Sequence, residues 1–196
     1  MSKTIVMLKN VRLAFPVLKE AERFDPSNAK QEPRFSANLL FPKSNKALYD
    51  ECMAAMHAAA EGKWGAAKAA AAVKSLSAGL KVALVDGDLK ADKYDGFEGM
   101  WSVNAHAKES TPPRLLDRDK TELPRNNSKL YAGCYVNVSI EFWAQDNQFG
   151  KRINAQLRGV QFAADGDAFG GARPASADEF DVVEGVDEDA TVDDFA

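Results

Sequence analysis

Four aspartates close together in the sequence are the residues of this chain best suited to metal-assisted chemistry. They are Asp86, Asp88, Asp92 and Asp95. Nuclease carboxylates hold divalent cations in this way, but a calcium loop requires a bidentate glutamate at its twelfth position, which is Phe97 here. A second Asp-Gly-Asp string at 165–167 shows that turns readily produce the same pattern. A turn is the favoured interpretation, and a metal-dependent nuclease or resolvase that uses Asp86, Asp88 and Asp95 stays open as an alternative.

The other metal-binding and nucleophilic residue types do not form a catalytic set. His57, His106, Cys52 and Cys134 lack the spacing of zinc ligands. The sequence contains no glycine-rich phosphate loop and no serine in a nucleophile elbow. We therefore expect a protein that is not an enzyme and needs no metal or cofactor. Two cysteines are too few for a disulfide framework, so we expect both to be reduced, buried residues of a cytoplasmic protein.

Aromatic residues near basic ones offer a different chemistry, the binding of single-stranded nucleic acid. A positive groove holds the phosphates of such a strand, and each base stacked on a ring contributes about 1–3 kcal/mol. The candidate rings are Tyr94, Trp101, Tyr131, Tyr135 and Trp143. The candidate cations are Arg12, Arg34, Lys90, Lys93, Lys108, Arg114, Lys129, Lys151 and Arg152. Tyr131 and Tyr135 are the better ring candidates, whereas Trp101 shares a strand face with apolar residues and is equally well explained as core.

The charges are segregated along the chain. Residues 178–196 contain nine acids and no lysine or arginine, which leaves 25 basic against 20 acidic residues in the rest. A basic body suits a polyanionic partner, and an acidic tail can compete for the same surface. We expect the tail to be disordered. The tail residues expected to contact partner proteins are Asp187, Glu188, Asp189, Asp193, Asp194 and Phe195.

The elements that must position these side chains are best defined between residues 130 and 162. In the first of two strand-like runs, alternate residues form the apolar set Val136, Val138, Ile140 and Phe142. The second run, after a turn at 146–150, has the apolar set Ile153, Ala155 and Leu157. A period of two is typical of a half-buried strand. The apolar phase flips after Gly159, which predicts a β-bulge that curls the hairpin.

Further strands are predicted before this hairpin. They lie at 4–15, where Pro16 ends the apolar run, at 34–41 and at 100–107. In the strand at 34–41, Arg34, Ser36 and Asn38 are predicted to point away from the core. The segments at 19–33 and 108–129 are predicted to be loops, the second one basic and proline-containing.

Between these strands the period changes to that of a helix. Ser44 or Asn45 can cap a first helix, which has Leu48, Cys52 and Met56 on one face. A second, alanine-rich helix is predicted at about 64–78, ending at Gly79. The predicted fold class is therefore mainly β with a helical insert that plugs one end of a small nucleic-acid-binding barrel. With 196 residues, no long apolar run and no signal peptide, we expect one domain that does not span a membrane.

Several segments resemble a family of phage and prophage proteins catalogued as a domain of unknown function, DUF2815. The resemblance is carried by Asp86-Gly87-Asp88, Tyr94-Asp95-Gly96-Phe97, Ala132-Gly133-Cys134-Tyr135 within 130–143, and the stretch 150–171. It covers most of residues 3–180. That family is similar to the T7-type phage single-stranded DNA-binding proteins.

This resemblance implies an OB-fold, a five-stranded Greek-key barrel, that coats single-stranded DNA in phage replication or recombination. It also implies a homodimer in the bacterial host cytoplasm, with an acidic tail that contacts replication or recombination proteins and covers the DNA groove. The implied layout is an OB-fold domain at 1–165 with a helical insert at about 45–78, a linker at 166–177 and a tail at 178–196.

The sequence is compatible with three functions. The favoured one is a non-enzymatic protein that binds single-stranded DNA without sequence preference. The others are the nuclease or resolvase described above and an assembly protein of the virion, with the tail as a hook for a partner. The residue pattern does not separate single-stranded DNA from single-stranded RNA as the ligand.

Overall fold

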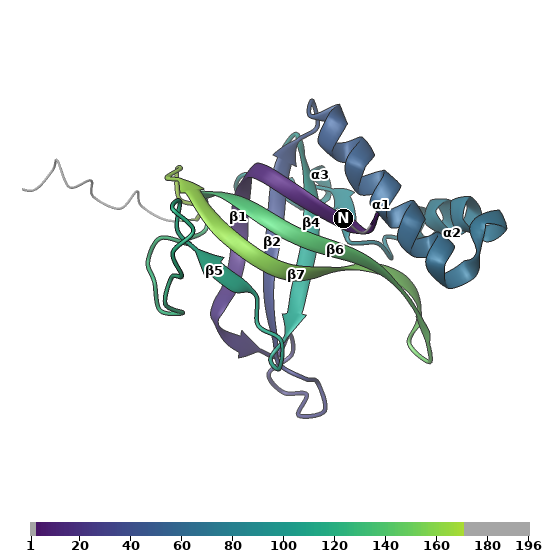
Figure 1. The fold of residues 1–196 in the computed structure, drawn as a ribbon, viewed down its shortest axis with the longest axis horizontal. Coiled ribbons are helices and arrows are strands. Elements are labelled where there is room, and N and C mark those ends of the chain that lie inside the picture. The colour runs from purple at the N-terminus through teal and green to yellow at the C-terminus, as the bar shows by residue number, and fades with distance from the viewer. Residues whose placement is uncertain (1–2, 171–196) are drawn as a thin grey trace, which may run out of the picture.

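Seven strands and three helices make up residues 3–170, the part of the chain that the computed structural model describes (Figure 1). The long strands are β1 (Ile5–Glu22), β2 (Arg34–Pro42), β4 (Met100–Lys108), β6 (Tyr135–Asn147) and β7 (Gly150–Ala164). Two short strands, β3 (Leu84–Asp86) and β5 (Arg114–Leu116), lie at the edges of the sheet.

The five long strands close into a barrel. Each neighbouring pair in the order β1-β2-β4-β7-β6-β1 is hydrogen-bonded, and the closing pair β4–β7 is parallel while the others are antiparallel. This order is that of the OB-fold, a small Greek-key barrel. The predicted mainly-β fold with a five-stranded OB-like barrel and a helical insert is confirmed.

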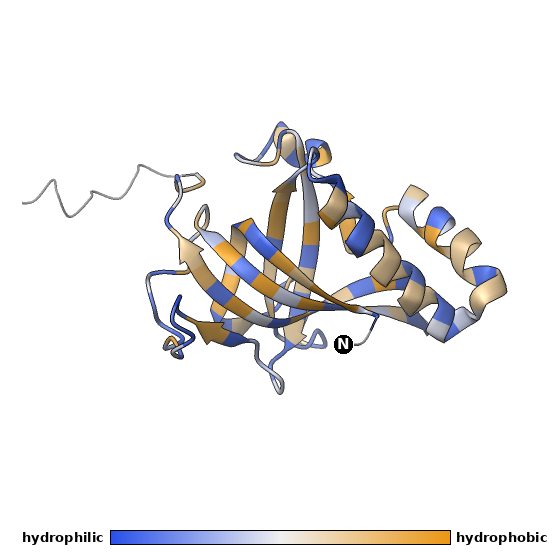
Figure 2. Ribbon diagram, turned by 45° about the horizontal axis from the view of Figure 1, so that its top comes forward, coloured by the Kyte–Doolittle hydropathy of each residue, from blue (hydrophilic) through white to orange (hydrophobic). Residues whose placement is uncertain are grey.

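The β6–β7 hairpin follows the register that its alternating pattern predicts. Val136, Val138 and Ile140 are fully buried, as are their counterparts on β7, and apolar and polar bands alternate along both strands (Figure 2). Between Ser139 and Ile140 the partners shift from Gly159 to Leu157, which leaves one extra residue on β7. The predicted bulge at Gly159 is therefore confirmed, and it bends the hairpin around the barrel.

Strand β1 departs from the prediction because it does not end at Pro16. It continues to Glu22, so residues 19–22 belong to a strand rather than to a loop. Its pairing with β2 shifts between Ala14 and Val17, and Phe15 has a positive φ of 47°. Pro16 thus lies in an irregularity, where a missing backbone N–H costs no ladder hydrogen bond. A second correction is that the predicted loop at 108–129 contains β5.

The helical insert lies between β2 and β4, as predicted. Helix α1 (Lys46–Trp64) is capped by Asn45, whose Oδ1 accepts a hydrogen bond from the Leu48 N–H at 3.2 Å. α1 packs its apolar face, including Cys52 and Met56, against the barrel, and α2 (Ala66–Ala78) packs on α1 (Figure 1). The third helix, α3 (Asp88–Ala91), is a single turn after the Gly87 corner.

Both cysteines are buried free thiols, as predicted. Burial raises the pKa of Cys52 and of Cys134 to about 12, so neither thiol ionises to a reactive thiolate near neutral pH. No helix between residues 3 and 170 combines the length and the hydrophobicity that crossing a membrane requires.

Candidate nucleic-acid interface

Three rows of polar side chains run across the outer face of β2 and β4. Directly opposite partners in the antiparallel ladder are Arg34 and Lys108, Ser36 and His106, and Asn38 and Asn104. Opposed residues in a ladder project to the same side of a sheet. The alternate residues of β2, such as Phe35 and Leu39, are buried in the barrel core, so the polar rows face outward.

A hollow of about 670 Å³ lies over these rows, and we call it the groove. Its floor includes Arg34, Ser36, Asn38, Asn104 and His106. One wall is the β1–β2 loop at 23–33, with Arg23 and Phe24, and the other carries Lys90 and Tyr94. Glu22 and Glu32 also line it, so the groove contains both signs of charge.

The β1–β2 loop is held in shape by its own polar contacts. Arg23 Nε donates to the Gln31 carbonyl oxygen at 2.9 Å, and the Asp25 N–H donates to Gln31 Oε1 at 2.8 Å. Ser27 Oγ donates to Asp25 Oδ1 at 2.6 Å, and this hydrogen bond lowers the pKa of Asp25. The loop leaves the ring of Phe24 95% exposed at the groove wall. An apolar ring held in water by an ordered loop is suited to stacking on a base.

Two rings of the groove lining, Phe15 and Tyr94, form a cluster with the buried ring of Phe97. Phe15 and Tyr94 meet edge to face with their centroids 4.8 Å apart, and Phe97 lies 5.8 Å from Phe15 beneath them. Phe97 is buried, but Phe15 and Tyr94 are 46% and 45% exposed. The predicted ring Tyr94 therefore lines the groove with an accessible face.

His106 is half-buried on the floor of the groove. Burial, and then the positive charge of Arg34, lowers the pKa of His106 to about 4. The imidazole is therefore neutral near pH 7 and contributes hydrogen bonds rather than charge. The positive charge of the groove comes from Arg23, Arg34 and Lys90, with Lys108 opposite Arg34.

The groove thus contains some of the predicted DNA-binding residues and several that sequence reasoning missed. Arg34, Lys90 and Tyr94 line it, Lys108 is opposite Arg34, and Lys93 lies beside Tyr94 in an adjoining cavity. The missed residues are Phe15, Arg23, Phe24, Ser36, Asn38, Asn104 and His106. The outward alternation of β2 was visible in the sequence, whereas nothing there indicated which loop would rise beside it.

Arg12, Tyr131 and Tyr135, which we call the tyrosine patch, are engaged in internal contacts. Tyr131 Oη donates to the Gly166 carbonyl oxygen and accepts from the Gly166 N–H, both at 2.9 Å. Arg12 donates to the carbonyl oxygens of Gly133 at 2.7 Å and Asp167 at 2.6 Å, and its guanidinium lies 4.9 Å from the Tyr135 ring centroid. These contacts fasten residues 165–169, which follow β7 and include the start of the predicted linker, onto the barrel.

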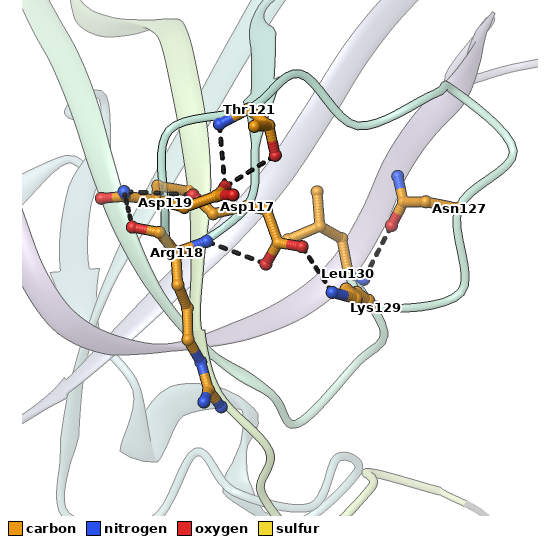
Figure 3. A network of polar contacts seen from close by, with 8 residues as sticks. Asp117, Arg118, Asp119, Thr121, Asn127, Lys129 and Leu130 are labelled. Carbon is orange, nitrogen blue, oxygen red and sulfur yellow. Dashed lines mark hydrogen bonds and ion pairs between the residues drawn. The ribbon is translucent and has the colours of Figure 1, made fainter.

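In the basic segment before β6, Figure 3 shows one cation, Lys129, paired with a carboxylate. Lys129 Nζ donates to Asp117 Oδ2, which lowers the pKa of Asp117, and Asn127 Oδ1 accepts from the Leu130 N–H at 3.0 Å. In the same segment Arg114 Nη2 lies 2.7 Å from Glu122 Oε1. The positive charges of Arg114 and Lys129 are therefore each matched by a carboxylate.

The remaining predicted residues lie toward the other end of the barrel. Trp101 stacks on Tyr49 of α1 with the centroids 4.6 Å apart, which makes it a half-buried packing residue. Lys151 pairs with Asp146 at 3.6 Å near the β6–β7 turn. Trp143 and Arg152, which are both exposed, lie on the same hairpin.

The aspartates considered for a metal site hold a lysine instead. Lys43 Nζ lies 2.6 Å from Asp86 Oδ1 and 2.5 Å from Asp88 Oδ2, and Asp88 Oδ1 accepts from the Gly99 N–H at 2.7 Å. The Lys43 hydrogen bond is the main cause of the lowered pKa of Asp88. Across residues 3–170, no group of three or more His, Cys, Asp or Glu side chains is arranged to hold a metal ion. Two of the three carboxylates that the nuclease alternative requires, Asp86 and Asp88, are thus engaged by Lys43.

The acidic tail lies outside the described residues. This applies to the predicted partner contacts Asp187, Glu188, Asp189, Asp193, Asp194 and Phe195.

Comparison with known proteins gives consistent matches over nearly the whole chain. A family model described as the ssDNA-binding protein of Enterobacter phage Enc34 matches residues 4–193. Protein p50 of Acyrthosiphon pisum secondary endosymbiont phage 1 is 39% identical over 179 residues, which cover 90% of this chain and 92% of that protein.

Two solved structures of phage proteins are similar to this fold. The single-stranded DNA-binding protein from bacteriophage Enc34, in complex with ssDNA, superposes with a TM-score of 0.71 at 30% identity, covering 84% of this chain and 89% of that one. The single-stranded DNA-binding protein gp2.5 of bacteriophage T7 has a TM-score of 0.53 at 13% identity, covering 84% and 93%. At 13% identity, the similarity to gp2.5 shows a shared fold and nothing more.

Proposed function

This chain belongs to the family of the Enterobacter phage Enc34 ssDNA-binding protein, and on this premise we propose that it binds single-stranded DNA without sequence preference, through the groove. The observation that carries the proposal is the groove itself. It lies over the second and third barrel strands, β2 and β4, next to the loop between the first two, which is where OB-folds bind oligonucleotides. The family and its solved member are binding proteins and not enzymes.

The proposed mechanism divides the groove between phosphates and bases. Arg23, Arg34 and Lys90 neutralise phosphates, which releases condensed counterions from the strand. Phe24 and Tyr94 offer exposed ring faces to bases, and stacking on a ring is insensitive to base identity. The amides of Asn38 and Asn104 and the neutral imidazole of His106 supply hydrogen bonds between the two walls. This arrangement supports binding that depends on salt but not on sequence.

The wider role that we propose follows the resemblance seen in the sequence. The protein coats single-stranded DNA as a homodimer, during phage replication or recombination in the host cytoplasm. The resemblance also favours membership of the DUF2815 family. Its acidic residues from 178 onward recruit partner proteins and compete with DNA for the groove, and residues 166–177 link them to the barrel domain. The nine acids and no bases after residue 177 support the competitor role.

The central experiment is a titration of labelled oligothymidylate with the full chain, followed by fluorescence anisotropy at several salt concentrations. We expect tight binding at low salt and a linear fall of log K with log salt, because each neutralised phosphate releases counterions. Duplex DNA of the same length is the matched competitor, and oligouridylate tests RNA. Failure to bind the single strand at low salt, or a stronger affinity for the duplex, would refute the proposal.

The role of the acidic segment is tested by removing residues 178–196. The shortened chain should bind oligothymidylate more tightly than the full chain, and the difference should shrink as salt rises because screening weakens the competition. Equal affinities at low salt would exclude the competitor role without affecting the proposal for the groove.

A further inference from the structure

A second, smaller cavity opens beside the groove and shares two of its rings. It has a volume of about 210 Å³, and Phe15 and Tyr94 line both hollows. The rest of its lining is mostly apolar and includes Phe97, Ala132 and Phe169. Pockets for drug-sized ligands run to about 300–1,000 Å³, so this cavity suits a ligand as small as a single planar ring system.

The wall formed by Phe169 is fixed by close packing. A side-chain Cβ at position 96 would lie 2.2 Å from the Phe169 ring, so only glycine there allows the ring to approach. The guanidinium of Arg12 lies 4.5 Å from the centroid of the same ring, and the Phe169 N–H donates to the Ala132 carbonyl oxygen at 3.0 Å. The cavity is therefore formed before any ligand arrives, as binding pockets usually are.

The wall formed by Phe15 is held in a strained conformation. Phe15 has a φ of 47°, in the left-handed region that residues other than glycine, asparagine and aspartate rarely adopt. The strain turns an aromatic ring outward beside the groove, where it is braced by Tyr94 and Phe97. Backbone strain of this kind is concentrated at ligand-binding sites, because there the conformation serves the ligand.

We propose that this cavity receives one nucleobase of the bound single strand. That base turns out of the groove between Phe15 and Tyr94, while the phosphates of the strand stay on the groove cations. The inference rests on the proposed function and adds a base site to it. Continuity with the groove supports it, and Lys90 lines the groove beside Tyr94, where it can hold the phosphate of that base. The charges of Lys93 and Asp95 in the cavity lining balance, which suits an uncharged base. Gly170 also lines the cavity, so the alternative occupant is the part of the chain that follows it.

The test fills the cavity without touching the groove. Ala132 lines the cavity but not the groove, so Ala132→Leu fills the cavity and leaves the groove lining unchanged. Ala132→Ser, with a side chain of nearly the same size as alanine, is the matched control. The full chain and both variants are titrated with oligothymidylate and with an abasic oligonucleotide of equal length and charge. Ala132→Leu should weaken oligothymidylate binding by about tenfold, the scale of one lost base stack, and leave abasic binding unchanged. Ala132→Ser should match the unchanged chain with both ligands.

Three other outcomes separate the competing explanations. If Ala132→Leu keeps its thermal midpoint and binds oligothymidylate as the unchanged chain does, the base site is refuted while the groove proposal stands. If Ala132→Leu binds both oligonucleotides more tightly, the cavity normally holds the chain's own C-terminal segment, and the base site is again refuted. If the unchanged chain binds neither oligonucleotide, the proposed function itself fails.

A second measurement covers the case in which Ala132→Leu does not fold. An oligonucleotide with 5-iodouracil is photocrosslinked to the unchanged chain, and the attached residues are mapped by mass spectrometry. Phe169 lines the cavity and not the groove, so a crosslink there supports the base site. Crosslinks confined to groove residues such as Phe24 would overturn it.

Discussion

The groove and the tyrosine patch both combine rings with cations on one barrel, but they differ in what those groups already contact. In the tyrosine patch, Arg12 donates to two backbone carbonyls and covers Tyr135, while Tyr131 exchanges two hydrogen bonds with Gly166. In the groove, Phe24 and Tyr94 keep exposed faces. A ring and a cation are available to a ligand only when the fold does not already use them.

The same contrast separates the cations of the groove from those of the segment between β4 and β6. Lys129 and Arg114 each face one carboxylate, so their charge is balanced within the chain. Arg34 has Lys108 beside it on β4 and Glu22 beside it on β1, which leaves two cations for one acid. Like charges directly opposite in a ladder are destabilising, and a bound phosphate would relieve that repulsion. The groove is therefore the region of the two that gains from an anion.

The largest expected effect is the loss of DNA affinity when the charge of the groove is reversed. The double variant Arg34→Glu with Lys90→Glu should weaken oligothymidylate binding on the order of 100-fold at low salt and reduce the slope of log K against log salt by about 2. Anisotropy titrations over a salt series measure both quantities. Lys68→Glu with Lys74→Glu on α2 is the control, and an equal loss there would mean that total charge matters and the groove does not.

The next effect is on stability and should arise in the tyrosine patch. Tyr131→Phe removes both hydrogen bonds to Gly166 and should lower the free energy of unfolding by about 2 kcal/mol, because two part-buried backbone groups lose their partner. Oligothymidylate affinity should change less than twofold. Urea denaturation measures the change in stability, and fluorescence anisotropy on the same sample measures the change in affinity. A large loss of oligothymidylate affinity with unchanged stability would contradict this prediction and would mean that Tyr131 contacts DNA.

A smaller effect should distinguish two exposed phenylalanines on different loops. Phe24→Ala at the groove wall should weaken oligothymidylate binding about tenfold through the loss of one stacked base. Phe149→Ala, at the β6–β7 turn where the ring is 78% exposed, should cost clearly less. Both rings are solvated before binding, so neither change should lower stability. Equal losses would extend the binding surface to the hairpin.

The smallest predicted effect is a pH dependence that comes from His106. Its folded-state pKa of about 4 lies below the ordinary value of 6.5, so the unfolded chain takes up a proton first as the pH falls. The contribution to stability is complete above pH 6.5 and is lost as the pH falls toward 4. Between pH 6.5 and 5 the free energy of unfolding should fall by an amount on the order of 1 kcal/mol that His106→Asn removes. Identical pH profiles for the two chains would show that burial of the imidazole is not the cause.

The sequence alone determined the local features of the fold. The faces of β2, β6 and β7, the bulge at Gly159 and the Asn45 cap each follow from residues a few positions apart, because side-chain alternation, bulges and caps are local in origin. The class of the fold followed from these together. The continuation of β1 through Pro16 did not, since it depends on pairing with β2 at Val17 and Glu22, whose partners are distant in the sequence.

Only the tertiary structure decided which polar groups are free for a ligand. Lys43 meets Asp86 and Asp88, and Arg12 reaches the carbonyl of Asp167, across separations that the spacing of residues does not encode. The groove likewise exists because the β1–β2 loop and the segment around Tyr94 rise on either side of two strands. A periodic pattern specifies which face of a strand meets water, whereas the neighbours of that face are set by long-range packing.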